Sequence, residues 1–169
     1  VVGAGFMIAL RNEDNLNKNE QAYEYYFNRA QDKFEVGNYK EAIIDYNKAL
    51  GLSPTEICLV YSMRGNAKRN LGDFEGAISD QNKALDFDHL YADGYFNRSS
   101  AKFKMGDFTG AIDDYSQVIK INPKDSDAFF NRANVKKEIG DMNGACEDWR
   151  KAVDLGDEEA AKLMQENCE

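Results

Sequence analysis

The chain has 169 residues, 43% of them hydrophobic, which is enough to bury a continuous core as one domain. Its 30 acidic and 21 basic residues give a net charge of −9. Binding to a phosphate backbone needs clustered positive charge, so the composition predicts no nucleic-acid partner. The single histidine, His89, argues against His-based metal sites and His-assisted nucleophiles, and we expect neither a metal nor a cofactor.

The N-terminal ten residues, VVGAGFMIAL, are wholly apolar, and a polar run follows from Arg11. A membrane-spanning helix needs about 20 apolar residues, so this segment is too short to cross a membrane alone. Three interpretations stay open: the remnant of a longer anchor or targeting segment, a strip that packs against a partner, or sequence introduced for expression. We expect membrane association only through residues 1–10 or through a partner, and we assign residues 1–22 to this apolar segment and a polar lead-in.

Four glycines mark an internal repeat over most of the remaining chain. Gly37, Gly72, Gly106 and Gly140 are separated by 35, 34 and 34 residues, and the sequences that follow them align without gaps. These sequences are GNYKEAIIDYNKAL, GDFEGAISDQNKAL, GDFTGAIDDYSQVI and GDMNGACEDWRKAV. Such a period is typical of a solenoid built from repeated helical hairpins.

Turn and capping residues support one hairpin per repeat. Each glycine can adopt the left-handed conformation that ends a helix, and the Asn or Asp after it can cap the next helix. Between repeats, Ser53-Pro54-Thr55-Glu56 fits a capping box, and Asn122-Pro123 repeats the pattern of a cap followed by proline. We expect these two segments to open the first helix of the next unit.

The repeated columns of aromatic and small residues resemble the tetratricopeptide repeat (TPR) family. An aromatic residue early in each first helix is followed one turn later by a small residue, and an alanine opens each second helix. These columns are Tyr26, Tyr61, Tyr95 and Phe129; Ala30, Gly65, Ser99 and Ala133; and Ala42, Ala77, Ala111 and Ala145. The resemblance implies an all-α, right-handed superhelical solenoid of four TPR hairpins over residues 23–156, with units at about 23–56, 58–91, 92–125 and 126–156.

Residues 157–169 follow the fourth unit and are predicted to form a capping helix. Acidic residues after Gly156 suit the first turn of a helix. Ala160, Leu163 and Met164 then form one apolar stripe. A terminal repeat needs such a helix to cover its hydrophobic side.

Three charged columns are complete in all four units, and the two basic ones depart from the usual family pattern, which has apolar or aromatic residues there. Every unit has an Arg, a Lys four residues later and an Asp sixteen residues after the Arg. They are Arg29, Arg64, Arg98 and Arg132; Lys33, Lys68, Lys102 and Lys136; and Asp45, Asp80, Asp114 and Asp148. A charge near a helix contact needs a partner, so we predict Arg–Asp pairs within a unit or between units. The alternative is a stripe of basic residues that binds an anion.

The family resemblance implies a concave groove that binds a protein or peptide. Exposed aromatic residues often mark interaction surfaces, and asparagine can hydrogen-bond a peptide backbone. The alternative is that these side chains only stabilise neighbouring repeats. The predicted contact residues are Phe27, Asn28, Gln31, Phe34, Met63, Asn66, Phe96, Asn97, Phe103, Phe130, Asn131 and Asn134. A chaperone-tail carboxylate clamp is not expected, because its basic positions hold Phe27 or Ser62, Asp93 or Asp127, and Asn97 or Asn131.

No nucleophile, base and orienting group occur at a recognisable spacing, and no glycine loop suits a phosphate, so catalysis is not predicted. The leading hypothesis is a non-catalytic interaction module, an adaptor or scaffold that binds a peptide segment of a partner. The alternative is a structural or assembly subunit of a larger complex, which could be membrane-associated, held through residues 1–10 and the convex face.

Cysteine spacing gives no sign of a disulfide or of a metal site. Cys58, Cys146 and Cys168 form no CxxC motif, and their odd number leaves at least one unpaired within the chain. We therefore expect free thiols, as in the cytoplasm or another reducing compartment, although the compartment itself stays open.

Overall fold

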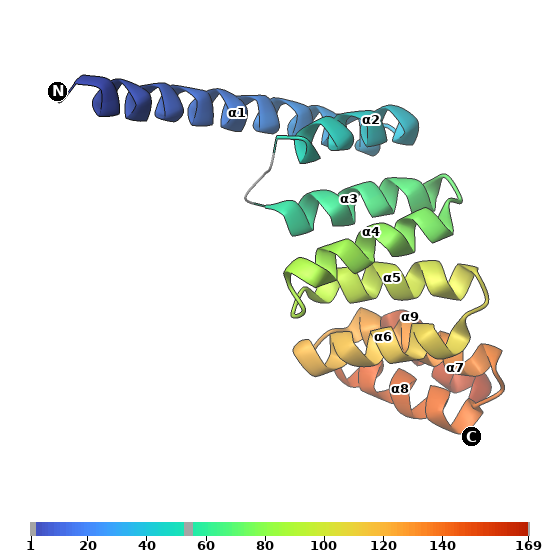
Figure 1. Ribbon diagram of the computed structural model, residues 1–169. Coiled ribbons are helices and arrows are strands. Elements are labelled where there is room, and N and C mark those ends of the chain that lie inside the picture. The colour runs from blue at the N-terminus through green and yellow to red at the C-terminus, as the bar shows by residue number, and fades with distance from the viewer. Residues whose placement is uncertain (1–2, 53–55, 169) are drawn as a thin grey trace.

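The computed structural model describes the backbone of residues 3–52 and 56–168 and the side chains of residues 17–52 and 56–168. Within these ranges the chain forms helices joined by short turns, and no strand occurs (Figure 1). The helices are α1 (Gly3–Glu35), α2 (Tyr39–Leu50), α3 (Ile57–Asn70), α4 (Phe74–Phe87), α5 (Ala92–Lys104), α6 (Phe108–Ile121), α7 (Ser126–Glu138), α8 (Met142–Asp154) and α9 (Glu158–Asn167).

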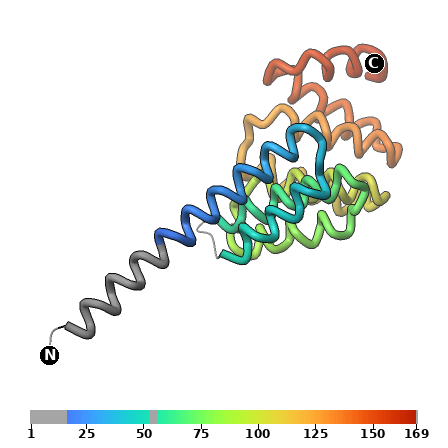
Figure 2. The backbone as a smooth tube through the Cα atoms, turned by 90° about the horizontal axis from the view of Figure 1, so that it is seen from above, coloured from blue at the N-terminus to red at the C-terminus, as the bar shows by residue number. Residues whose placement is uncertain are grey.

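Consecutive helices pair into four hairpins, which we number unit 1 (α1 and α2) to unit 4 (α7 and α8). Each second helix also packs against the first helix of the next unit, and α9 packs on α8. Figure 1 shows the hairpins stacked from α1 and α2 at one end to α7 and α8 at the other, and Figure 2 shows α9 at the edge of the stack. The predicted all-α solenoid of four hairpins with a terminal helix is confirmed.

The turn inside units 2, 3 and 4 has the predicted chemistry. Gly106 has a φ of +82°, and an added Cβ would meet no atom within 4 Å, so the left-handed backbone, not crowding, requires glycine there. The following Asp107 accepts a hydrogen bond from the backbone N–H of Gly110 at 2.9 Å. Asp73 and Asp141 form the same cap, whereas Asn38 forms no side-chain cap.

The start of α7 differs from the prediction. Asn122 does not cap this helix, because its Oδ1 accepts from the backbone N–H of Lys124 and closes a turn before it. The N-cap is Asp125, which accepts from the N–H of Ala128 at 2.9 Å. The other predicted start, Ser53-Pro54-Thr55, lies outside the described residues, and α3 begins at Ile57.

Helix α1 is much longer than the others, with 33 residues against 10 to 14. It runs without a break through residue 23, where the first unit was predicted to begin, and it extends beyond α2 (Figure 1). The side chains of residues 1–16 are outside the described part, so the interpretations of residues 1–10 keep their status as hypotheses. None of the described helices has the length and hydropathy needed to span a membrane.

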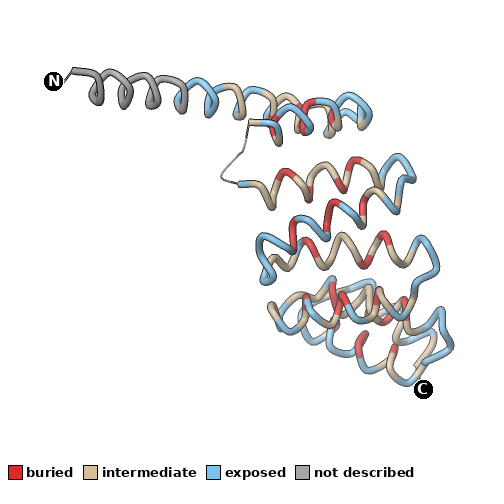
Figure 3. Tube along the Cα trace, viewed as in Figure 1, coloured by how far each residue is buried: buried red, intermediate tan, exposed pale blue. Residues whose placement is uncertain are grey.

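Buried residues follow the helix faces that meet inside and between hairpins, drawn red in Figure 3. Each second helix contributes one large side chain to this interior. Three of these are aromatic, namely Tyr46, Tyr115 and Trp149. Unit 2 instead has Gln81, whose amide donates to the Ser62 carbonyl at 3.1 Å. Glycine at position 65 makes space for this amide, because a Cβ there would lie 2.8 Å from Gln81 Nε2.

The C-terminal helix closes the stack, and here one prediction is wrong. Ala160 of α9 is buried, and Leu163 and Met164 pack on the cluster around Trp149. Cys146 and Cys168 form a disulfide, with their Cα atoms 5.8 Å apart, so only Cys58 is free. The spacing in sequence gave no hint, because α9 folds back over α8 and joins residues 22 apart. The expectation of a reducing compartment rested on free thiols and loses that support.

Candidate protein-interaction surface

Each unit holds one buried carboxylate between two cations of its first helix. In unit 3, Arg98 donates from Nε and Nη2 to the two oxygens of Asp114 at 2.8 and 2.6 Å. Lys102 Nζ lies 2.8 Å from the same carboxylate. The other three units repeat this fork and the second cation, so the predicted Arg–Asp pairs are confirmed within units.

The remaining guanidinium nitrogen links neighbouring units. Arg64, Arg98 and Arg132 each donate from Nη1 to a side-chain oxygen on the second helix of the preceding unit. The acceptors are Asn47 at 2.5 Å, Asn82 at 2.6 Å and Ser116 at 2.9 Å. In unit 1, Arg29 donates instead to Tyr25 of its own helix at 2.9 Å. Among the described residues the Arg–Asp pairs therefore lie within units, and the contacts of these arginines with the preceding unit go to the neutral acceptors Asn47, Asn82 and Ser116.

These contacts hold the charges in their ionised form. Hydrogen bonds from Arg29 lower the pKa of Asp45 from 3.8 to about 2, and Lys33 acts in the same direction. The hydrogen bonds that Asp114 accepts raise the pKa of Arg98. The guanidinium groups are thereby committed to protein acceptors, and little basic surface is left for an anionic ligand.

We use the name first-helix surface for the predicted contact residues on α1, α3, α5 and α7 together with Arg69 and Lys137, which share the Phe34 column. The four Phe-column positions differ in exposure. Phe27 is 9% exposed and packs on Tyr46 with ring centroids 6.0 Å apart, so the structure places this predicted contact residue in the core. Ser62 is buried, and Phe96 and Phe130 are half-buried.

The asparagine column keeps polar groups at the surface. Asn28 is exposed. Asn97 donates an amide N–H to Ser62 Oγ at 3.3 Å, which joins α5 to α3, and Asn131 donates to the Asp127 carbonyl at 2.7 Å. In the part of the chain that the structure describes, no donor reaches the carboxamide oxygens of Asn97 and Asn131, so both can accept from a ligand. Met63 stands in this column in unit 2.

The next column serves the interior more than the surface. Asn134 Oδ1 accepts from the indole N–H of Trp149 at 3.2 Å, and Ser100 shares a hydrogen bond with the Tyr115 hydroxyl at 3.2 Å. Buried aromatic residues with a polar atom need such a partner. We therefore assign Asn134 a structural role. Gln31 and Asn66 hold the same column in units 1 and 2 and are half-buried.

The last column lies near the hairpin turns and combines aromatic and basic residues. Phe34 packs edge-on against Tyr39, and Phe103 packs on Phe108. Arg69 and Lys137 hold the other two positions. The first-helix surface thus presents amides and half-buried aromatic side chains with few free charges.

Three features of this region were missed from sequence. The acceptors Asn47, Asn82 and Ser116 recur at the repeat period, so a search for polar residues 16 or 17 positions before each arginine would have found them. The Asn134–Trp149 contact joins residues 15 apart, a spacing shared by Ser100 and Tyr115. The disulfide has no comparable signal.

A cleft also lies at the C-terminal end, between α8 and the end of α9, with Glu147, Arg150 and Gln165 among its lining residues. Among the described residues, no group of three or more His, Cys, Asp or Glu side chains is arranged to hold a metal ion.

Family comparisons agree with this architecture. Profiles described as tetratricopeptide repeat match residues 23–56 and 60–88, and one described as TPR repeat matches residues 100–140. No curated protein sequence matches the chain.

Several solved structures share the fold. A crystal structure of MamA is 23% identical over 89% of this chain and 86% of its own, with a TM-score of 0.76. YrrB, described as a TPR protein with an unusual peptide-binding site, is 20% identical over 96% of this chain and 89% of its own, with a TM-score of 0.74. The first TPR domain of Spaghetti (RPAP3), bound to the HSP90 peptide SRMEEVD, is 24% identical over 71% of this chain and 94% of its own, with a TM-score of 0.67. By its family matches, its hairpins and its right-handed solenoid fold, the chain belongs to the tetratricopeptide repeat family.

Proposed function

We propose that this TPR protein is a non-catalytic adaptor that binds a peptide segment of a partner protein along the first-helix surface. TPR proteins are generally protein–protein interaction modules. The observation that carries the finer proposal is the pair of unused carboxamide oxygens on Asn97 and Asn131, beside the half-buried rings of Phe96 and Phe130.

The chemistry of these groups suits a peptide backbone. A carboxamide oxygen accepts from a backbone N–H whatever the side chain of that residue is. The rings of Phe96 and Phe130 add apolar area that a ligand side chain can cover, each buried CH₂ group being worth roughly 0.8 kcal/mol. We infer that apolar contact with the phenylalanine rings provides the affinity, and that the asparagines fix the register of the peptide backbone along the surface.

Charge supports a ligand with no strong acidic requirement. In each unit the buried aspartate pairs with both the arginine and the lysine, so these side chains are already engaged and keep few N–H donors for an anionic segment. The basic positions of a carboxylate clamp hold Phe27 in unit 1 and Asp93 and Asn97 in unit 3. A partner unlike the HSP90 tail of the Spaghetti complex therefore fits better.

Peptide display against the full chain, followed by calorimetry on the selected peptide, tests the proposal. We expect Asn97→Ala with Asn131→Ala to weaken binding about tenfold, since two hydrogen bonds are each worth about 0.5–1.5 kcal/mol. Asn143→Ala, an exposed asparagine on α8, is the matched control and keeps the affinity. If the double variant binds as tightly as the parent, the asparagines are not contact residues.

One observation favours the second hypothesis, an assembly subunit. Helix α1 has 33 residues, more than twice the 13 or 14 of the other first helices, whereas its hairpin partner α2 has 12. In that case, deletion of residues 1–10 abolishes assembly into the larger complex, and the asparagine double variant assembles normally. Under the adaptor hypothesis, the asparagine double variant fails to capture the partner, and deletion of residues 1–10 leaves capture intact.

A further inference from the structure

The terminal helix α9 is held at two ends by different means. At its start, Gly156 with a φ of +97° ends α8, and Asp157 caps α9 through the N–H of Ala160 at 2.9 Å. At its end, Cys168 is bonded to Cys146 of α8. Between these points only Ala160 is fully buried.

Without the disulfide, little would keep α9 in place. It has 10 residues, and isolated helices shorter than about 12–15 residues are marginal in water. Its packing residues Leu163 and Met164 are half-buried. The covalent link therefore decides how often the end of α9 separates from α8.

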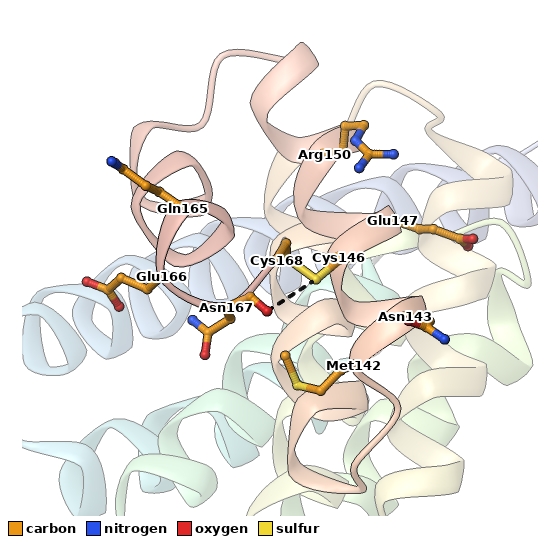
Figure 4. Close-up of a pocket in the computed structure, with 9 residues that line it drawn as sticks. All are labelled: Met142, Asn143, Cys146, Glu147, Arg150, Gln165, Glu166, Asn167 and Cys168. Atoms are coloured by element: carbon orange, nitrogen blue, oxygen red, sulfur yellow. Dashed lines mark hydrogen bonds between the residues drawn. A yellow bond between two sulfur atoms is a disulfide. The ribbon is translucent and has the colours of Figure 1, made fainter.

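The disulfide is reachable from solvent. It lies at the cleft between α8 and the end of α9, and both cysteines are half-buried and contribute to the cleft lining (Figure 4). Polar residues line this cleft on both sides, with Glu147 and Arg150 on α8 and Gln165 on α9. A thiolate can approach a sulfur atom along this open side.

We propose that Cys146–Cys168 is a thiol–disulfide exchange site for a protein dithiol reductant, and that its reduction undocks α9 from α8. This inference concerns the end of the solenoid and does not depend on the peptide-binding proposal.

The exchange is balanced in two steps. A thiolate of the dithiol attacks one sulfur, forming a mixed disulfide while the other cysteine leaves as a thiolate and takes a proton. The second thiol of the reductant, as a thiolate, then attacks the reductant's sulfur in the mixed disulfide. The cysteine of the TPR protein that was bound there leaves as a thiolate and takes a proton. The products are the oxidised dithiol and free thiols at Cys146 and Cys168, so two electrons and two protons pass to the TPR protein.

Release of α9 changes the environment of the only tryptophan in the chain. Trp149 is 0% exposed and belongs to the same buried cluster as Ala160, Leu163 and Met164. Ala145 and Ala152 on α8 complete that cluster. Undocking exposes the face of unit 4 that α9 covers. Acrylamide should then reach the Trp149 indole more easily and quench its fluorescence more strongly.

Hydrogen–deuterium exchange of the full chain, oxidised or treated with reduced thioredoxin, tests the proposal. We expect amides of residues 158–167 to exchange about 300-fold faster after reduction, because closing a loop of this size restrains opening by about that factor. Amides of α3 to α6 keep their exchange rates. Cys168→Ser is expected to exchange fast in α9 without reductant and to show no further response to it.

Cys58→Ser is the matched control, because it removes the free thiol and leaves the disulfide intact. It responds to thioredoxin like the parent. Three observations would each overturn the proposal: three titratable thiols in the oxidised protein, a disulfide that thioredoxin reduces only in denaturant, or equal α9 exchange and Trp149 quenching before and after reduction.

Discussion

Replacement of Asp114 by alanine tests the role of the Arg–Asp–Lys clusters in the scaffold. Asp114 is 3% exposed and accepts two hydrogen bonds from Arg98, while Lys102 Nζ lies 2.8 Å away. Alanine leaves both cations without their carboxylate. Losing one partner of a buried pair costs about 3–5 kcal/mol. The lower end, about 3 kcal/mol, applies here, since the side chains of Arg98 and Lys102 are each 19% exposed and water screens them.

For a chain of this length, that loss lowers Tm by about 6–12 °C. Urea denaturation and thermal melting followed by circular dichroism measure it. Asp113→Ala, the exposed neighbour on α6, is the control and should change the free energy of unfolding by less than about 0.5 kcal/mol. Peptide affinity per folded molecule should be unchanged. A variant at Asp114 with parent-like stability and lost binding would refute the structural assignment and favour an anion-binding stripe.

Three further predictions concern acid stability, the hairpin turn and the asparagines. The pKa of Asp45 is lowered from 3.8 to about 2, so its contribution to stability is complete above pH 4 and is lost as pH falls toward 2. Asp45→Asn should flatten that acid limb in pH-dependent melting, and an unchanged limb would contradict the pair. Gly106→Ala should cost about 1 kcal/mol in urea denaturation because φ is +82°, whereas Gly51→Ala, at a φ of −66°, should be neutral or slightly stabilising. Equal effects of the two would contradict the turn geometry. Asn134→Ala should cost about 1–3 kcal/mol because it strands the indole N–H, while Asn131→Ala should cost less than about 0.5 kcal/mol, and the reverse order would remove the distinction between the two columns.

The helical architecture could be predicted because it depends on local chemistry repeated four times. Gly106 and Asp107 specify a turn through their own backbone and side-chain preferences, and the period multiplies that signal. The Arg98–Asp114 pair was predictable for a similar reason, since unpaired charges at a helix contact are costly.

Features that depend on how the two helices of a unit pack together were harder to predict. Phe27 and Phe96 share a column, and each packs on the buried tyrosine of its second helix, yet in unit 1 the ring of Tyr23 also stacks on Phe27. Asn134 resembles a surface amide until Trp149 is known to lie beside it. Such roles depend on distances between helices, which residue type alone does not encode.

The predictions for the two C-terminal cysteines and for the start of α7 were wrong for different reasons. Cys146 and Cys168 meet because α9 returns over α8, a tertiary arrangement with no spacing rule. Asn122 and Asp125 are both good capping residues three positions apart, and local preference could not choose between them.

The division of the repeat into scaffold and contact columns is tested most directly by NMR titration with the selected peptide. We expect the side-chain amide signals of Asn97 and Asn131 to shift on binding, while those of Asn143 and the side-chain guanidinium signals of Arg64 and Arg98 stay in place. Shifts of the arginine signals without shifts at Asn97 and Asn131 would contradict the account.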